Sequence, residues 1–201
     1  MKAKKVKTTP QLKLNLGCGF NHIDGYVNVD NFDTCNPDVL LNLENTPWTM
    51  WEDNSVDEVY MCHVLEHLGQ HVTVYFQIIK ELYRICKDGA VIEIIVPHWM
   101  HENFAHDPTH CRIVTPIGLA MFNQQRNLND MANGGAESKL GLMLGVDFEL
   151  TNVVYIPDGH WAAVSEQEGW SEQDIFQRMK DTPGVCQEMR MTLIALKPHQ
   201  K

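Results

Sequence analysis

The chain has 201 residues, 44% of them hydrophobic, and its 26 acidic and 16 basic side chains give a formal net charge of -10. This length and apolar content suit one domain with a sizeable core, so a second full domain is not expected. The negative charge disfavours nucleic acid or an anionic membrane as the main partner. Because no apolar run approaches the roughly 20 residues that cross a bilayer, we expect a cytoplasmic protein with no membrane partner.

The first residues and the cysteines set the outline of the domain. Residues 1–11 are basic and lack apolar periodicity, which predicts a flexible tail, and residues 12–201 would form the single domain. Six cysteines occur without a C-x-x-C pair, so we expect reduced thiols and no disulfide framework. These cysteines are Cys18, Cys35, Cys62, Cys86, Cys111 and Cys186.

The chain then gives a strand, a glycine turn and a second strand. Alternating apolar residues over 12–16 predict a strand that runs into Gly17-Cys18-Gly19, and residues 26–30 predict a short strand that ends in Asp30. The glycines are either an ordinary tight turn or a place where the backbone approaches a ligand closely. An acid on the neighbouring strand tip can accept two hydrogen bonds from a ribose diol. NAD is disfavoured, because G-x-G-x-x-G is absent and Asp30 follows too soon.

Strands and helices alternate over the first half of the chain. Short apolar runs predict strands at residues 38–43, 56–62 and 90–96, and helical spacing predicts a core-facing helix over 71–86 that ends in the turn 87–89. This order predicts an α/β sheet, in which ligands bind beyond the carboxyl ends of the strands. The residues expected at such ends are Gly17, Asp30, Leu43, His63 and His98.

The second half is less regular. Thr115 and Pro116 predict the start of a helix, and residues 123–140 are polar and predict a mobile loop that could act as a lid. Residues 146–156 and 189–196 predict two strands. Between them, residues 157–169 look irregular, and Ser171 would cap a helix over 171–180.

Four segments in collinear order carry a family resemblance: LNLGCG, GYVNVD, DNSVDEVYMCHVLEHL and ELYRICKDGAVIEIIVPH. Over residues 12–98 they resemble the class I S-adenosylmethionine-dependent methyltransferases, in particular a compact branch with a short first crossover. The resemblance implies a Rossmann-like, mostly parallel sheet flanked by helices, with an antiparallel C-terminal hairpin. It also implies S-adenosylmethionine as cofactor, S-adenosylhomocysteine as product, and these cofactor-binding residues: Leu16, Gly17, Cys18, Gly19, Asp30, Asn42, Leu43 and His63.

The segment HWMHENFAHDPTHCRIVTP, residues 98–116, is rich in histidine. Its D-P-T-H-x-R run resembles an acceptor loop of some methyltransferases of this branch, with Asp107 and Arg112 as substrate-binding residues. Arg112 could clamp a carboxylate or a phosphate in bidentate fashion. The density of potential ligands over residues 98–111 also suggests a zinc or iron enzyme. Because the spacing matches no standard helix-borne ligand pair, we expect no metal.

The function that these features predict is methyl transfer to an oxygen or nitrogen of a small-molecule acceptor. The displacement is in line, so the protein mainly aligns donor and acceptor and can take up a proton. His98, His106 and His110 are the candidate bases, and each could equally be a structural or surface histidine. An N-P-P-Y signature of nucleic-acid amino methylation is absent. Asn15 and Asn42, where the family often has acids, keep a non-catalytic cofactor-binding protein as an alternative, and the oligomeric state stays open.

Overall fold

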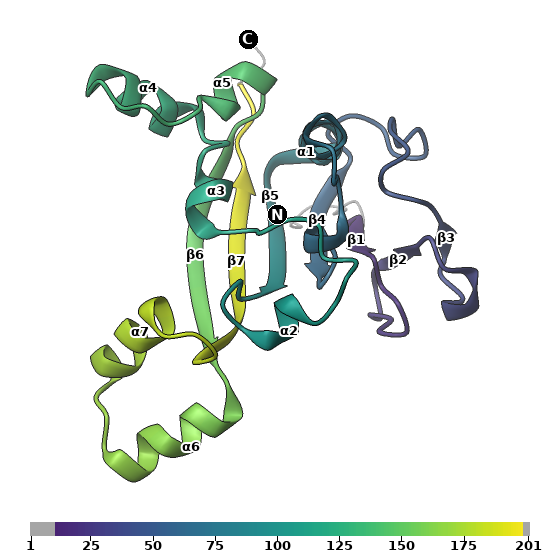
Figure 1. Ribbon diagram of the computed structural model, residues 1–201. Helices are drawn as coiled ribbons and strands as arrows, with labels where there is room; N and C mark the ends of the chain where they lie inside the picture. The colour runs from purple at the N-terminus through teal and green to yellow at the C-terminus, as the bar shows by residue number, and fades with distance from the viewer. Residues whose placement is uncertain (1–10, 199–201) are drawn as a thin grey trace, which may run out of the picture.

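The sheet of this protein has seven strands in the order β3-β2-β1-β4-β5-β7-β6 (Figure 1). The computed structural model describes residues 11–198, so residues 1–10 of the expected tail lie outside the described residues. The first five strands pair in parallel, and β7 runs antiparallel to both β5 and β6. The predicted α/β fold is therefore confirmed. The strands are Lys13–Leu16 (β1), Val27–Asp30 (β2), Val39–Leu40 (β3), Val56–Cys62 (β4), Cys86–Pro97 (β5), Phe148–Pro157 (β6) and Cys186–Ala195 (β7).

Helices and short 3-10 turns make the connections between the strands. Two 3-10 turns, η1 (Asp33–Cys35) and η2 (Leu65–His67), follow β2 and β4. No helix in the described part of the chain is both long and apolar enough to span a membrane. The α-helices are Val72–Ile85 (α1), Glu102–Ala105 (α2), Pro116–Ala120 (α3), Gln124–Ala132 (α4), Leu140–Leu144 (α5), Gly159–Glu168 (α6) and Glu172–Asp181 (α7).

The parallel half owes its stability to apolar side chains buried in the sheet and under α1. Leu14 and Leu16 of β1 are fully buried, as are Ile78 and Ile85 of α1. Helix α1 buries one apolar face against the core, as its helical spacing predicts. Residues 17–26 join β1 to its parallel neighbour β2 without a helix, so the glycine turn lies directly at the end of β1.

Strand β5 begins earlier than expected. The residues 87–89, predicted as a turn after the helix, belong to the strand, which starts at Cys86. Val56 pairs with Cys86 and Glu58 pairs with Val91, so the extra residues form an irregularity in the ladder. The physical reason is that a bulge accommodates extra residues without ending the strand.

All six cysteines are free thiols, as expected.

Two segments predicted as irregular are helical. Within residues 123–140, Asn123 accepts a hydrogen bond from Arg126 N and starts α4. Within residues 157–169, Asp158 accepts from His160 N and starts α6. The capping side chain accepts a hydrogen bond from a backbone N–H group that would otherwise be unpaired at the start of the helix. This bond stabilises the helix even though its polar composition gives little apolar periodicity. The helix capped by Ser171 is present as α7, with a capping box to Asp174.

Different helices lie at the two ends of the strands. Helices α2, α6 and α7 lie near the carboxyl ends of the parallel strands, where β6 ends and β7 begins (Figure 1). Helices α4 and α5 lie at the opposite end, where Asn123 Nδ2 donates to Asp147 Oδ1 and Leu196 N donates to Asp147 O. The segment expected as a lid therefore lies away from the strand ends where a ligand is expected, because the capping residue of α4 binds Asp147, directly before β6.

Candidate functional site

A pocket of about 310 Å³ lies at the carboxyl ends of β1, β2 and β4. A larger open cleft of about 920 Å³ lies near the start of β5 and the C-terminal part of α1. Since ligands of open α/β sheets bind beyond the carboxyl ends of the strands, the smaller pocket is the candidate site. Its lining residues are Gly17, Gly19, Asp30, Asn31, Leu41, Asn42, Leu43, His63, Val64, His67 and Leu68.

The two glycines of the turn serve different purposes. Gly17 has φ +71°, and a Cβ there would lie 2.8 Å from Val64 Cγ1 and closer still to Cγ2. Its N–H donates to Val29 O at 2.7 Å, which fixes the turn onto β2. Gly19 has φ +49°, and a Cβ there would meet nothing within 4 Å. Gly17 is therefore required by conformation and packing, whereas Gly19 borders open space.

Asp30 closes the turn from the tip of β2. Its Oδ2 accepts from Gly19 N at 2.8 Å, and its Oδ1 accepts from Phe32 N at 2.9 Å. A carboxylate oxygen has two lone pairs, so each oxygen can accept one further hydrogen bond. The side chain thus both holds the turn and presents an acceptor pair at the pocket.

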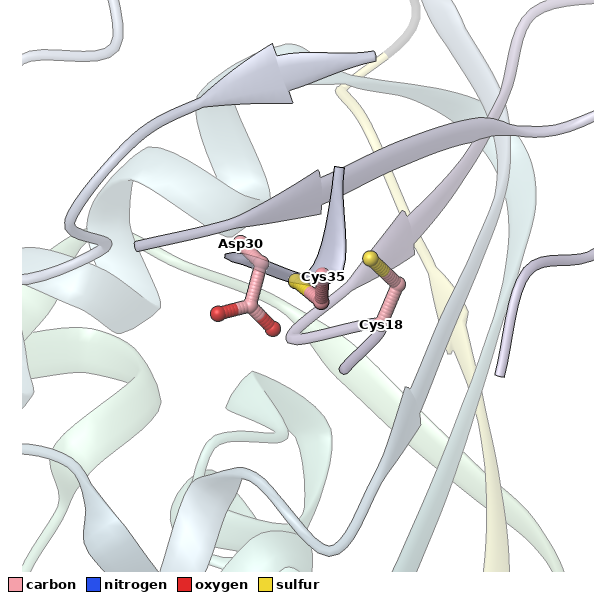
Figure 2. Close-up of side chains that lie close together, drawn as sticks. All are labelled: Cys18, Asp30 and Cys35. Carbon is pink, nitrogen blue, oxygen red and sulfur yellow. The ribbon is translucent and has the colours of Figure 1, made fainter. Parts of the chain in front are cut away.

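Two buried thiols lie beside this carboxylate (Figure 2). Burial, followed by the nearby Cys35 and Asp30, raises the pKa of Cys18 to about 11. A thiol with so high a pKa is protonated near neutral pH and is a poor nucleophile. Cys18 and the fully buried Leu16 do not line the pocket, although both were predicted to bind cofactor.

The third strand tip supplies an apolar wall and an amide. Leu41 and Leu43 line the pocket, and Leu43 is buried. Asn42 Oδ1 accepts from Glu44 N at 2.9 Å, which leaves the side-chain NH2 as a donor. This combination suits a flat heteroaromatic ring with acceptor nitrogens.

His63 lies between two carboxylates on the other side of the pocket. Its Nε2 lies 3.1 Å from Glu188 Oε2, and its Nδ1 lies 3.4 Å from Glu66 Oε1. Glu66 first, and Glu188 in addition, raise the pKa of His63 above its usual value against the opposing effect of burial. The left-handed φ of +55° at His63 turns the chain sharply after β4.

The histidine loop after β5 folds back over the carboxyl end of β4, beside the pocket. The N–H groups of Cys111 and Arg112 both donate to Glu66 O, at 2.9 and 3.1 Å. His67 Nδ1 lies 2.9 Å from Thr109 Oγ1. These contacts place the D-P-T-H run of the loop directly beside His67, a lining residue of the pocket.

The three candidate bases occupy different environments. His98 is 1% exposed, and burial, followed by His101, lowers its pKa. His106 is exposed, and its Nδ1 lies 2.8 Å from Glu102 O. The ring of His110 meets the edge of the His67 ring at 4.5 Å between centroids. His110 is thus the candidate base that contacts the wall of the pocket.

The two predicted substrate residues are engaged with the protein. Arg112 donates from Nη2 to Gly69 O, and its guanidinium lies 3.9 Å from the centre of the Tyr75 ring. It therefore fixes the turn before α1. Asp107 Oδ1 accepts from the hydroxyl and the N–H of Thr109 at 2.6 and 2.8 Å, and these bonds lower the pKa of Asp107. Asp107 is accordingly a carboxylate at neutral pH.

Several pocket residues were not assigned from the sequence. Their signal was their position at or shortly beyond the carboxyl end of a predicted strand. His67, which the sequence did not assign to the site, also lines the pocket. The other unassigned lining residues are Asn31, Leu41, Val64 and Leu68.

Comparison with known proteins identifies the fold. No family model matches the sequence, and no curated protein matches it. Among solved structures, a SAM-dependent methyltransferase from Archaeoglobus fulgidus matches with a TM-score of 0.56 and 17% identity, over 92% of this chain and 86% of that one. The chain therefore has the Rossmann-like fold of the SAM-dependent methyltransferases.

Two further structures show how varied the chemistry of this fold is. A phosphoethanolamine N-methyltransferase from Haemonchus contortus, in complex with phosphomonomethylethanolamine and S-adenosylhomocysteine, matches with a TM-score of 0.52 and 13% identity, over 96% of this chain and 50% of that one. The [4+2]-cyclase SpnF matches with a TM-score of 0.51 and 12% identity, over 94% and 76%. At such identities the likeness defines the fold alone, and function must be argued from the site.

Proposed function

We propose that the protein is an S-adenosylmethionine-dependent methyltransferase that acts on an oxygen or nitrogen of a small-molecule acceptor. The observation that carries the proposal is Asp30, whose carboxylate keeps free lone pairs at the tip of β2, beside the glycine turn. A nucleoside ribose offers two hydroxyl donors in the matching arrangement. The strand order and the position of the pocket support the same proposal.

The residues around the pocket suit the remaining parts of this cofactor. The open space beside Gly19 admits a ligand close to the backbone, and the backbone of Leu16 and Cys18 borders the turn. Leu43 offers an apolar face to the adenine, and the amide of Asn42 offers a donor to a ring nitrogen. S-adenosylmethionine supplies an electrophilic methyl group on a positively charged sulfur.

The acceptor end is proposed to lie at the histidine loop, residues 98–116. Of the candidate bases His98, His106 and His110, we favour His110, because it contacts His67 on the pocket wall. Asp107 supplies a negative charge at the same rim, and Arg112 supports the turn beneath it.

Calorimetric titration with S-adenosylhomocysteine and S-adenosylmethionine tests the cofactor site. We expect saturable binding that Asp30→Asn weakens about 10-fold to 100-fold, because one charge-assisted hydrogen bond of about 1.5–3 kcal/mol is lost. Asp33→Asn, a change of an exposed aspartate just after β2, is the matched control and should bind like the wild type. Equal affinity of the Asp30 variant and wild type, or no binding at all, would refute the proposal.

An acceptor screen then tests turnover. Small molecules with a free hydroxyl or amine are incubated with the protein and radiolabelled S-adenosylmethionine, and transfer of label is measured. Label transfer supports the enzyme. Tight cofactor binding without label transfer to any of a broad acceptor set would favour the non-catalytic alternative.

A further inference from the structure

We propose that Glu66, His67 and His110 form a binding site for a divalent transition-metal ion at the edge of the cofactor pocket. Each side chain offers one ligand atom, and these atoms lie within 4.8 Å of one another. Two imidazoles with one carboxylate are a ligand set that suits zinc or iron and leaves coordination positions open. The ligands come from the turn after β4 and the loop after β5. Spacing within the loop alone, from which we expected no metal, could not reveal them.

The first argument is the burial of Glu66. Its side chain is 1% exposed, and neither carboxylate oxygen has a hydrogen-bond partner among the described residues. A buried carboxylate without compensation costs several kcal/mol. The nearest nitrogens are His63 Nδ1 at 3.4 Å and His110 Nε2 at 4.0 Å. The His63 ring is close enough for Glu66 to raise the pKa of His63, but neither nitrogen makes a hydrogen bond of good geometry to the carboxylate, so its compensation is incomplete. A cation between the ligands would compensate this charge.

The second argument is the orientation of His110. Its Nδ1 lies 2.8 Å from Phe104 O, and a carbonyl can only accept, so Nδ1 carries the proton. In the neutral ring, Nε2 then presents a lone pair toward Glu66 Oε1 across a gap too long for a hydrogen bond. His110 Nε2 and Glu66 Oε1 are then two facing acceptors, and a cation between them could bind both. A carbonyl on the far ring nitrogen is also the usual support of a metal-bound histidine.

The third argument is the support of His67. The Thr109 hydroxyl donates to Asp107 Oδ1 at 2.6 Å, so Thr109 Oγ1 accepts from His67 Nδ1–H at 2.9 Å. The Nε2 of His67 is therefore the nitrogen with the free lone pair. Asp107 Oδ2 lies 3.9 Å from His110 Nε2 and adds negative charge at the rim of the site.

The distances suit an ion with only small side-chain movements. Metal–ligand bonds of about 2.0–2.2 Å in tetrahedral geometry place ligand atoms roughly 3.3–3.6 Å apart. The ligand atoms of this cluster, now within 4.8 Å of one another, would approach by at most about 1.5 Å, which side-chain rotation supplies. Since His67 also lines the pocket, an open coordination position would lie within reach of an acceptor oxygen. With an ion bound, His110 Nε2 would be a metal ligand and not a base, so the role of base proposed for His110 belongs to the metal-free protein. Metal binding itself does not depend on the proposed methyl transfer.

Titration of the metal-stripped full chain with zinc, without nucleotide, tests the site. We expect the wild type to bind one equivalent of zinc. Glu66→Gln and His110→Asn should each weaken zinc binding at least about 100-fold, and Thr109→Val should weaken it about 10-fold. His71→Asn is the matched control, because His71 Nδ1 also contacts a threonine hydroxyl, Thr73 Oγ1 at 2.8 Å, but is exposed and belongs to no such cluster. Its zinc affinity should equal that of the wild type.

Binding elsewhere would overturn the proposal. In the described part of the chain, the other such cluster is Cys18, Asp30 and Cys35 (Figure 2). Cobalt substitution distinguishes the two clusters, because thiolate ligands give a sulfur-to-metal charge-transfer band and nitrogen and oxygen ligands do not. A thiolate band, zinc binding that Cys35→Ser removes, or no binding of one equivalent would each refute the site.

A measurement on the wild type covers the case in which the Glu66 variant does not fold. Two-bond proton–nitrogen NMR spectra report the tautomer of each histidine ring. We expect protonated Nδ1 in His67 and His110 without metal, and a selective shift of their Nε2 signals when zinc is added. Unchanged ring signals on zinc addition would contradict the proposal.

Discussion

Asn15 Nδ2 donates a hydrogen bond of 2.9 Å to Asn28 Oδ1, which joins β1 to β2 beneath the glycine turn. The same amide donates to Asn21 O at 2.9 Å, so it also holds the segment that returns from the turn. Asn15 is 2% exposed. An amide at this position therefore has a structural role, and its presence in place of the family's usual acid does not argue for loss of activity.

Asn15→Asp should destabilise the protein by at least about 2 kcal/mol. The new carboxylate would face two acceptor oxygens in a buried position, without a donor. Urea unfolding measures the loss. Asn42→Asp is the control, because an aspartate can still accept from Glu44 N at this exposed position, and it should change stability by less than about 0.5 kcal/mol. Similar effects of the two changes would contradict this account of Asn15.

The two glycines of the turn should respond differently to alanine. Gly17→Ala forces a left-handed φ on alanine and a clash with Val64, so we expect a loss of about 2–5 kcal/mol. Gly19→Ala should cost only about 1–2 kcal/mol, because its Cβ meets open space, but should weaken cofactor binding about 10-fold or more. Thermal unfolding and calorimetry measure the two quantities. Adding Val64→Ala to Gly17→Ala should restore only the part of the lost stability that is due to the clash.

Glu81 predicts a pH dependence of stability. Its carboxylate accepts two hydrogen bonds from Arg84, at 2.8 and 2.9 Å, and one from Trp48 N at 2.7 Å. Arg84 chiefly, with Trp48 N, lowers the pKa of Glu81 below its usual 4.5 despite burial. Because the folded pKa is the lower one, this stabilisation is complete above about pH 4.5 and is lost as the pH falls through the folded pKa.

Glu81→Gln should therefore cost about 1.5–3 kcal/mol at pH 7, and the difference from wild type should shrink below about pH 4.5. Urea unfolding at pH 7, 5 and 4 tests this. Glu52→Gln, at an exposed glutamate of the preceding loop, should stay within about 0.5 kcal/mol of wild type throughout. A pH-independent cost of Glu81→Gln would be the contrary result.

His98 should make stability depend on pH in a higher range than Glu81 does. Burial lowers its pKa below the usual 6.5, so the folded state holds the ring neutral while the unfolded chain takes up a proton. Stability should thus fall as the pH drops below about 6.5. His98→Asn should flatten this decline by up to about 1.4 kcal/mol per pH unit, measured between pH 7.5 and 5.5 with a chelator present. His71→Asn, at an exposed ring, should leave the slope unchanged.

Local pattern determined the parallel half of the fold and the core of the pocket. The alternation over β1 and the helical spacing over α1 reflect the periods of a strand and a helix, and the glycines after β1 mark a turn. All three signals depend only on residues that are close in sequence. This is why Gly17, Asp30 and Leu43 could be placed at the strand ends in advance. The helices α4 and α6 were missed because their starts depend on single capping side chains, Asn123 and Asp158.

Only the tertiary structure decided which histidines meet. The spacing of residues 98–111 offered many pairings, and nothing local distinguishes His106 from His110. Their separation follows from two long-range bonds, from Cys111 N and Arg112 N to Glu66 O, which fold the loop back onto the end of β4. Contacts between segments distant in the chain depend on how loops close over the sheet. The sequence alone therefore indicated where a nucleoside could bind, whereas the fold brought Glu66, His67 and His110 together.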